Sequence, residues 1–149
     1  MKKRTKIILT LIAILVISQL IRIDKSNEPI DPATDFVVLK EAPSDIVKIL
    51  KRSCYDCHSN TANYPWYTNI APVSWWIKHH INEGREELNF STFGTYDVKR
   101  ANHKMEEVVE MLEENKMPLT SYLIMHGEAK LTESEKESLI KWVKGLIEK

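Results

Sequence analysis

The segment Cys54-Tyr55-Asp56-Cys57-His58 constrains this chain more than any other feature, because it places two thiols and an imidazole within one short stretch. A C-x-x-C-H pattern is typical of the covalent attachment of c-type haem. Two cysteines about one helical turn apart can add to the vinyl groups along one edge of the porphyrin. The histidine that follows can then supply a neutral ring nitrogen to the iron. The motif predicts one covalently bound haem c, attached through Cys54 and Cys57, with His58 as an iron ligand.

Three other interpretations of the two cysteines stay open from the residues alone: a thioredoxin-like redox pair, a structural disulfide and half of a zinc site. A redox pair is expected where a strand leads into a helix, and the sequence has no strand pattern. A zinc site needs four ligands, usually from a second cysteine or histidine pair, and no such pair is present. The chain has two cysteines in all, so no other thiol competes for them. Haem is the favoured interpretation.

Charge is balanced over the whole chain but unevenly distributed along it. The 149 residues include 21 basic and 21 acidic side chains. Residues 1–23 carry five basic and no acidic residues, which leaves a net charge of −5 on residues 24–149. A chain of this length has room for one domain plus a tail or anchor. Because the domain has no basic patch, we expect no nucleic-acid partner.

The N-terminal segment has the pattern of an uncleaved signal anchor. Basic residues precede an uncharged, Ile- and Leu-rich run from Ile7 to Ile21. A cleaved signal peptide has similar features, but the small-x-small cleavage pattern is missing. We therefore predict a membrane helix within residues 1–24, an extended tether over 25–43 and a haem-binding domain over 44–149. The basic residues before the run predict a single-pass protein of the cytoplasmic membrane, with its C-terminal domain facing the periplasm.

Apolar residues with a period of 3.6 predict the helices of an all-α domain. The predicted helices cover residues 44–53, 72–88, 97–115 and 132–147. Ser44 is expected to cap the first helix, and Thr132 and Glu135 form a capping box for the last. We expect the last helix to pack on the first. The pattern therefore predicts a small helical domain of about four helices around the haem.

The loop after the motif and the helix that follows contain further candidates for contact with the haem. Trp66 lies in the aromatic stretch Tyr64-Pro65-Trp66-Tyr67 and could donate a hydrogen bond to a propionate. Arg85, on one flank of the helix, could pair with a propionate. His80 could be a packed core residue, a propionate partner or an iron ligand, whereas His79 is expected to be exposed. Packing and solvation are ordinary alternatives for all of these side chains.

Met117 is the predicted sixth ligand of the iron. Electron-transfer cytochromes commonly bind haem iron through a thioether, which raises the reduction potential. Met117 precedes Pro118 in a loop between two predicted helices, and proline disfavours helix at the residue before it. Met117 could instead fill a gap in the core. Met125 and His126 are rival ligands, and an open sixth position is the remaining alternative.

The chain resembles class I cytochrome c and, more closely, the bacterial haem-binding domain family of small membrane-anchored c-type cytochromes. The similarity covers about residues 40–145. It is carried by Cys54-Tyr55-Asp56-Cys57-His58-Ser59-Asn60, Tyr64-Pro65-Trp66-Tyr67, Ile70-Ala71-Pro72-Val73-Ser74-Trp75, Glu83-Gly84-Arg85, Leu88-Asn89-Phe90-Ser91 and Met117-Pro118. The resemblance implies thioether bonds at Cys54 and Cys57, His58 as proximal ligand and Met117 as distal ligand.

These features together predict a membrane-anchored electron carrier with a single haem. Its expected partners are redox proteins of the membrane or periplasm. Two axial protein ligands leave no position for a substrate, so we expect no catalytic activity. The alternative is a haem-based sensor or peroxidase-like protein with an open or displaceable sixth site.

Overall fold

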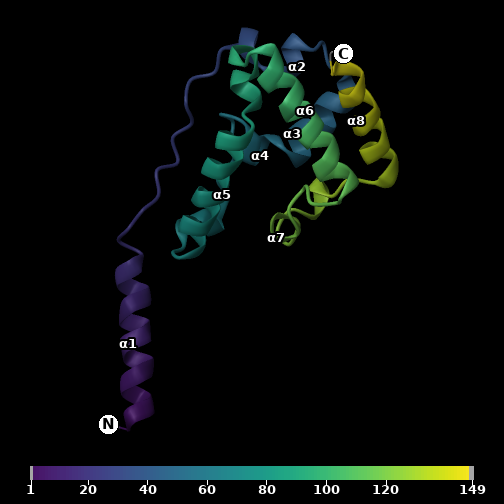
Figure 1. The fold of residues 1–149 in the computed structure, drawn as a ribbon. Coiled ribbons are helices and arrows are strands. Elements are labelled where there is room, and N and C mark those ends of the chain that lie inside the picture. Colours follow the sequence, from purple (N-terminus) through teal and green to yellow (C-terminus); the bar gives the residue numbers. More distant parts are fainter. Residues whose placement is uncertain (1, 148–149) are drawn as a thin grey trace.

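The structure is a computed structural model that describes residues 2–147, and within this range all of its secondary-structure elements are helices. The α-helices are α1 (Lys3–Ser18), α2 (Phe36–Leu39), α3 (Ser44–Ser53), α4 (Tyr55–His58), α5 (Val73–Glu87), α6 (Val98–Glu113), α7 (Thr120–Leu123) and α8 (Glu133–Leu146). Short 3-10 helices are η1 (Pro32–Thr34), η2 (Trp66–Asn69), η3 (Phe90–Thr95) and η4 (Gly127–Ala129). Helix α1 projects away from the body that the other helices form (Figure 1). The all-α prediction is confirmed.

Local capping explains where the two long C-terminal helices begin. The side chain of Asp97 accepts a hydrogen bond of 2.8 Å from the backbone N–H of Arg100 at the start of α6. Thr132 and Glu135 form the predicted capping box before α8. Ser44 is instead the first residue of α3 and makes no capping bond, so that detail was wrong. Because caps use neighbouring residues, they can be identified from the sequence.

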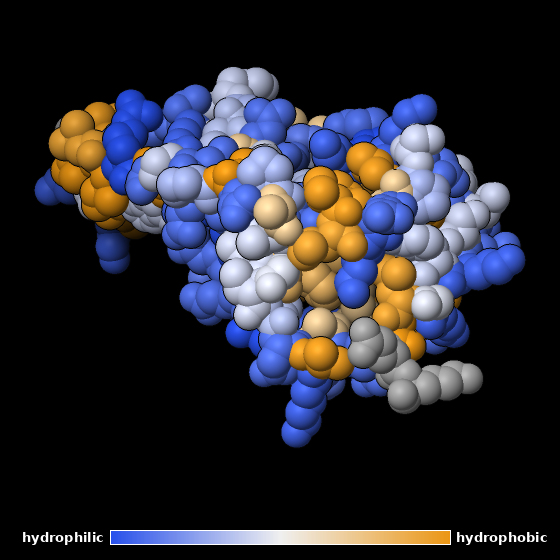
Figure 2. All heavy atoms as spheres, turned by 90° about the horizontal axis from the view of Figure 1, so that it is seen from above, coloured by the Kyte–Doolittle hydropathy of each residue, from blue (hydrophilic) through white to orange (hydrophobic). Residues whose placement is uncertain are grey.

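The core of the body joins residues from both ends of the domain. Phe36 is buried and packs its ring against Phe90, Phe93 and Trp142. Helix α8 packs against both α6 and α3, where packing on the first helix of the domain was expected. Seen from above, most of the surface is hydrophilic, and apolar side chains gather in separate areas (Figure 2). The apolar faces of α3, α6 and α8 are turned inward, whereas the apolar side chains of α1 are exposed.

The predicted membrane helix and single-pass membrane location are contradicted by the structure. Helix α1 ends at Ser18 and has 16 residues. Among the described residues, no helix has the length and apolar character needed to cross a bilayer. The apolar run continues to Ile21, but the side chain of Gln19 donates to and accepts from the backbone of Ala71, at 3.0 Å each. The apolar run therefore extends beyond the end of α1.

The segment predicted as an extended tether includes residues that belong to the packed body. Residues 25–31 are extended, but η1 and α2 follow within the same segment. Asp35 caps α2 and also accepts a hydrogen bond of 2.9 Å from the hydroxyl of Tyr55. Phe36 lies in the core, with 1% of its surface exposed. The packed body therefore begins before residue 44.

Candidate functional site

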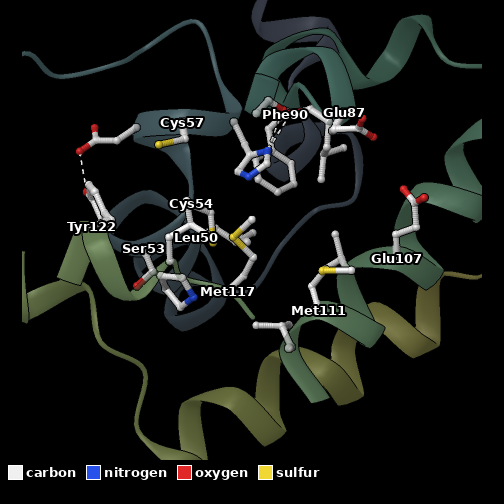
Figure 3. A pocket seen from close by; sticks show the side chains of 18 of the residues that line it. Leu50, Ser53, Cys54, Cys57, Glu87, Phe90, Glu107, Met111, Met117 and Tyr122 are labelled. Carbon is white, nitrogen blue, oxygen red and sulfur yellow. Dashed lines mark hydrogen bonds between the residues drawn. The ribbon is translucent and has the colours of Figure 1, made fainter. Parts of the chain in front are cut away.

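A cavity of about 470 Å³ lies between α3 and α4, α5, α6 and the segment that leads into α7. Its volume is within the range of roughly 300–1,000 Å³ that is common for cofactor and ligand sites. Four predicted site residues line it. They are Cys54, Cys57, His58 and Met117 (Figure 3). The fold thus brings together residues that are about 60 positions apart in the sequence.

The two cysteines are held by the junction of α3 and α4. Cys54 follows α3 directly, and Cys57 lies within the single turn of α4. Both are free cysteines. Burial raises the pKa of the Cys54 thiol to about 12 and that of Cys57 to about 11. Reactive redox cysteines have a lowered pKa and exist as thiolates near neutral pH, so this environment does not favour a thioredoxin-like role.

His58 is oriented through one of its two ring nitrogens. Its Nδ1 lies 2.8 Å from the carbonyl oxygen of Gly84 and 3.0 Å from that of Leu88. A carbonyl can only accept, so Nδ1 carries the proton and Nε2 keeps a free lone pair. Burial also lowers the pKa of the imidazole and favours its neutral form. Metal-bound histidines are commonly held in this way, with the second ring nitrogen donating to a backbone carbonyl.

The approach of α5 to the motif requires a glycine at position 84. A Cβ atom built on Gly84 would lie 2.8 Å from the carbonyl oxygen of Cys57 and 3.3 Å from its Cβ. Real Cβ atoms are not found that close to backbone, so any side chain here would push α5 away. Gly84 is therefore the residue that allows its own carbonyl to reach the His58 ring.

Met117 reaches the cavity because α6 ends in a defined turn. Asn115 adopts a left-handed conformation with a φ of 56°, which asparagine tolerates better than most residues. Its N–H donates to the carbonyl of Leu112, and the N–H of Lys116 donates to that of Met111, at 3.2 and 2.9 Å. This pair of bonds is a Schellman motif, which reverses the chain at a helix end. The turn directs the following residue, Met117, towards the motif.

A second methionine also lines the cavity. Met111 lies on α6, in the last turns before the helix ends, and is half-buried. Figure 3 shows Met111 and Met117 around the same space as the two cysteines. Met125 and His126, the alternative sixth ligands predicted from the sequence, both line a different cavity. Met111 is therefore a second candidate thioether ligand in this cavity.

Trp66 and Arg85 do not line the cavity that contains the motif. Trp66 is 69% exposed and borders a second, adjoining cavity of about 370 Å³. The guanidinium of Arg85 donates to the carbonyl of Ser59 at 2.8 Å and to the side chain of Asn27 at 2.9 Å. Arg85 thus ties the extended N-terminal segment to the residue after the motif. Cys57 and His80 line both cavities, so Trp66 shares the second one with a cysteine of the motif.

A hydrogen bond from α7 to the motif was not foreseen. The hydroxyl of Tyr122 donates to Asp56 Oδ2 at 2.8 Å, and Asp56 is one of the two residues between the cysteines. The Tyr122 ring also stacks on His126, with ring centroids 4.2 Å apart. Burial and, after it, the Asp56 carboxylate raise the pKa of Tyr122, so its hydroxyl stays protonated as a donor. The bond fastens the Met117 segment to the motif.

Replacing Tyr122 with phenylalanine removes the hydrogen bond to Asp56. The free energy of unfolding should fall by about 1–2 kcal/mol, because a partly buried carboxylate loses a donor. Chemical denaturation of the two proteins measures the change. Tyr64→Phe is the matched control, since the Tyr64 hydroxyl is buried and has no hydrogen-bond partner among residues 2–147. Equal stability of Y122F and the wild type would show that the bond contributes nothing.

One lysine connects the two long helices at the edge of the cavity. The ammonium group of Lys104 on α6 lies 2.7 Å from Glu107 and 3.0 Å from Glu87 on α5. All three residues line the cavity. These contacts raise the pKa of Lys104, mainly through the hydrogen bond to Glu107, and keep the lysine charged. The edge of the cavity is therefore charged, whereas the motif lies among apolar side chains.

The arrangement fits a haem better than the other candidates. A neutral imidazole with a free Nε2, two adjacent protonated thiols and a thioether lie around one large, mainly apolar cavity. A structural zinc site would need four clustered thiolate or imidazole ligands, and the described residues show no such group at the motif. The fold and site thus define an all-α haem-binding protein.

A comparison with protein families agrees with this conclusion. The family model described as haem-binding domain matches residues 13–145, which is most of the chain. The chain therefore belongs to the haem-binding domain family. No curated protein and no solved structure shows a significant match to it.

Proposed function

We propose that this protein is a c-type cytochrome that carries single electrons through one covalently attached haem. The observation that carries the proposal is the meeting of Cys54, Cys57, His58 and Met117 in one cavity. The cysteines would form thioether bonds with the haem, and His58 Nε2 and the Met117 sulfur would bind its iron. Such His/Met ligation is typical of electron-transfer cytochromes.

The haem would supply a one-electron iron couple, and the protein residues would set its environment. The carbonyl groups of Gly84 and Leu88 fix the ring of His58, so the ligand needs little reorganisation when the iron changes charge. A thioether favours the reduced iron and raises its potential. Apolar residues such as Leu50, Leu112 and Leu139 keep water from the inner wall of the cavity. The partners would be other redox proteins rather than a chemical substrate.

Optical and redox spectroscopy test the proposal on the full chain, produced with a cytochrome maturation system. We expect a low-spin ferric spectrum, a one-electron reversible reduction and little reaction with carbon monoxide or peroxide. A high-spin ferric spectrum with rapid binding of either molecule would contradict a carrier. That result would favour the alternative, a sensor or peroxidase-like protein with an open sixth site.

A further inference from the structure

Three potential metal ligands gather on one face of α5, next to the haem cavity. They are His79, His80 and Glu83. At 3.6 residues per turn, Glu83 projects at an angle between those of the two histidines, about 40° from His79 and 60° from His80. One ligand atom from each residue lies within 4.8 Å of the other two. The geometry of one helix is therefore enough to bring these three residues together.

The carboxylate of Glu83 faces both imidazoles. Its Oε1 lies 3.2 Å from His79 Nε2, and its Oε2 lies 3.6 Å from His80 Nδ1. A zinc ion binds imidazole nitrogen and carboxylate oxygen at about 2.0–2.2 Å, so ligand atoms a little over 3 Å apart can share one ion. Small rotations of the exposed side chains of His79 and Glu83 would bring the ligands to such distances.

His80 has a buried ring nitrogen that is too far from Glu83 for a hydrogen bond. Its Nδ1 is buried, and it has no hydrogen-bond partner among the described residues. The ring is also held in place by Trp76, with centroids 4.3 Å apart. Buried polar atoms are nearly always paired, and an unpaired one is commonly explained by a bound water or ion. The unpaired nitrogen belongs to the cluster that could hold a cation.

We propose that His79, His80 and Glu83 bind a divalent first-row transition ion, with zinc as the representative ion. Two imidazoles and one carboxylate are a common ligand set for zinc, and three protein ligands leave a fourth position for water. The same set binds copper(II) more tightly than zinc, as the general order of affinities for these ions requires. The site is separate from the haem iron, since it uses neither cysteine, His58 nor Met117.

The position of the cluster relates it to the haem cavity. His80 and Glu83 line that cavity, and His80 also lines the adjoining one. Gly84, which follows Glu83 directly, accepts the hydrogen bond from His58. A cation held on this turn of α5 would add positive charge near the iron and disfavour its oxidised form. Occupation of the site would therefore raise the reduction potential.

Helix α6 offers a matched control. His103 Nε2 lies 3.2 Å from Glu107 Oε1, the same distance and i,i+4 spacing as His79 and Glu83. Glu107 is already paired with Lys104, and no third ligand completes a group there within residues 2–147. A lysine ammonium beside the carboxylate repels a cation. His103→Ala therefore removes an exposed histidine without touching the proposed site.

Isothermal titration of the haem-loaded full chain with zinc chloride tests the proposal. We expect one zinc per chain, with affinity reduced about tenfold or more in H79A and in E83Q and unchanged in H103A. Both test residues are exposed, 65% and 57% at the side chain, so these variants should fold normally. Absorption spectroscopy at the zinc edge, which iron does not disturb, should show two imidazoles at about 2.0 Å.

Other outcomes would overturn the site. Equal zinc affinity in the wild type, H79A and E83Q would exclude these ligands. An equal loss in H103A would indicate nonspecific binding by surface histidines. A zinc shell without imidazole would exclude His79 and His80 as ligands. Because the titration detects zinc directly, its result is independent of whether the haem iron has a His/Met ligand pair.

Discussion

Replacing Cys54 and Cys57 together with serine should abolish covalent haem attachment, and replacing either one should reduce it about tenfold or more. A thioether bond needs the sulfur, whereas serine has nearly the same size and can occupy the same place. Haem staining after denaturing electrophoresis measures the result, because only covalently bound haem stays with the chain. The stained signal should be normalised to the amount of protein.

Ser53→Ala is the matched control for the cysteine variants. Ser53 is buried, lines the same cavity and precedes Cys54, and its hydroxyl has no partner among the described residues. It should keep full haem staining. If the double cysteine variant stained as strongly as the wild type, attachment through this motif would be refuted. The cysteines would then be available for a disulfide or another role.

Replacing Met117 with alanine should lower the reduction potential by about 0.1–0.3 V, because the thioether that favours reduced iron is lost. The weak far-red charge-transfer band of sulfur-bound ferric iron should disappear. The variant should also bind carbon monoxide readily, since one axial position becomes accessible. Potentiometric titration and optical spectra of the wild type and M117A measure these changes.

Met111→Ala provides the matched comparison, because Met111 has the same side chain and lines the same cavity. The M111A variant should keep the far-red band, and its reduction potential should stay close to that of the wild type. Loss of the band in M111A but not in M117A would move the sixth ligand to α6. Retention of the band in both variants would exclude both methionines. Each of these results is incompatible with Met117 as the ligand.

The long helices of the domain could be predicted because their signals are local. The capping box at Thr132 and the cap at Asp97 lie within one turn of the helices that they start. The apolar period of 3.6 residues marks the inward face of each helix. Membership of the haem-binding domain family agrees with what the C-x-x-C-H motif predicted about the cofactor.

The contacts around the site could not be predicted, because they join distant parts of the chain. Tyr122 and Asp56 are 66 positions apart, and no periodic pattern relates them. Arg85 was one candidate for pairing with a propionate, and its contacts with Ser59 and Asn27 have no signal in the sequence. No local pattern marks Met111 on α6 as a candidate ligand. Only the packing of α5 and α6 around one space brings it to the cavity.

The N-terminal prediction was wrong for a different reason. A run of apolar residues indicates low polarity, but it does not fix where a helix ends. Here the side chains of Ser18 and Gln19 both bond to the carbonyl of Leu15, and Gln19 also reaches Ala71. These bonds to backbone groups compete with continuation of the helix. Ser18 and Gln19, the polar residues near the end of the apolar run, indicate where the helix ends.

Helices α5 and α6, which form two walls of the cavity, pack on different parts of the protein. Helix α5 packs on α4 and η2, whereas α6 packs on α8, and the Lys104 ion pairs are the polar link between α5 and α6. The polypeptide thus forms two half-shells with an apolar space between them. A group that fills this space and binds only the folded chain stabilises that chain in proportion to its affinity. Binding of the cofactor would therefore add to the stability of the folded chain.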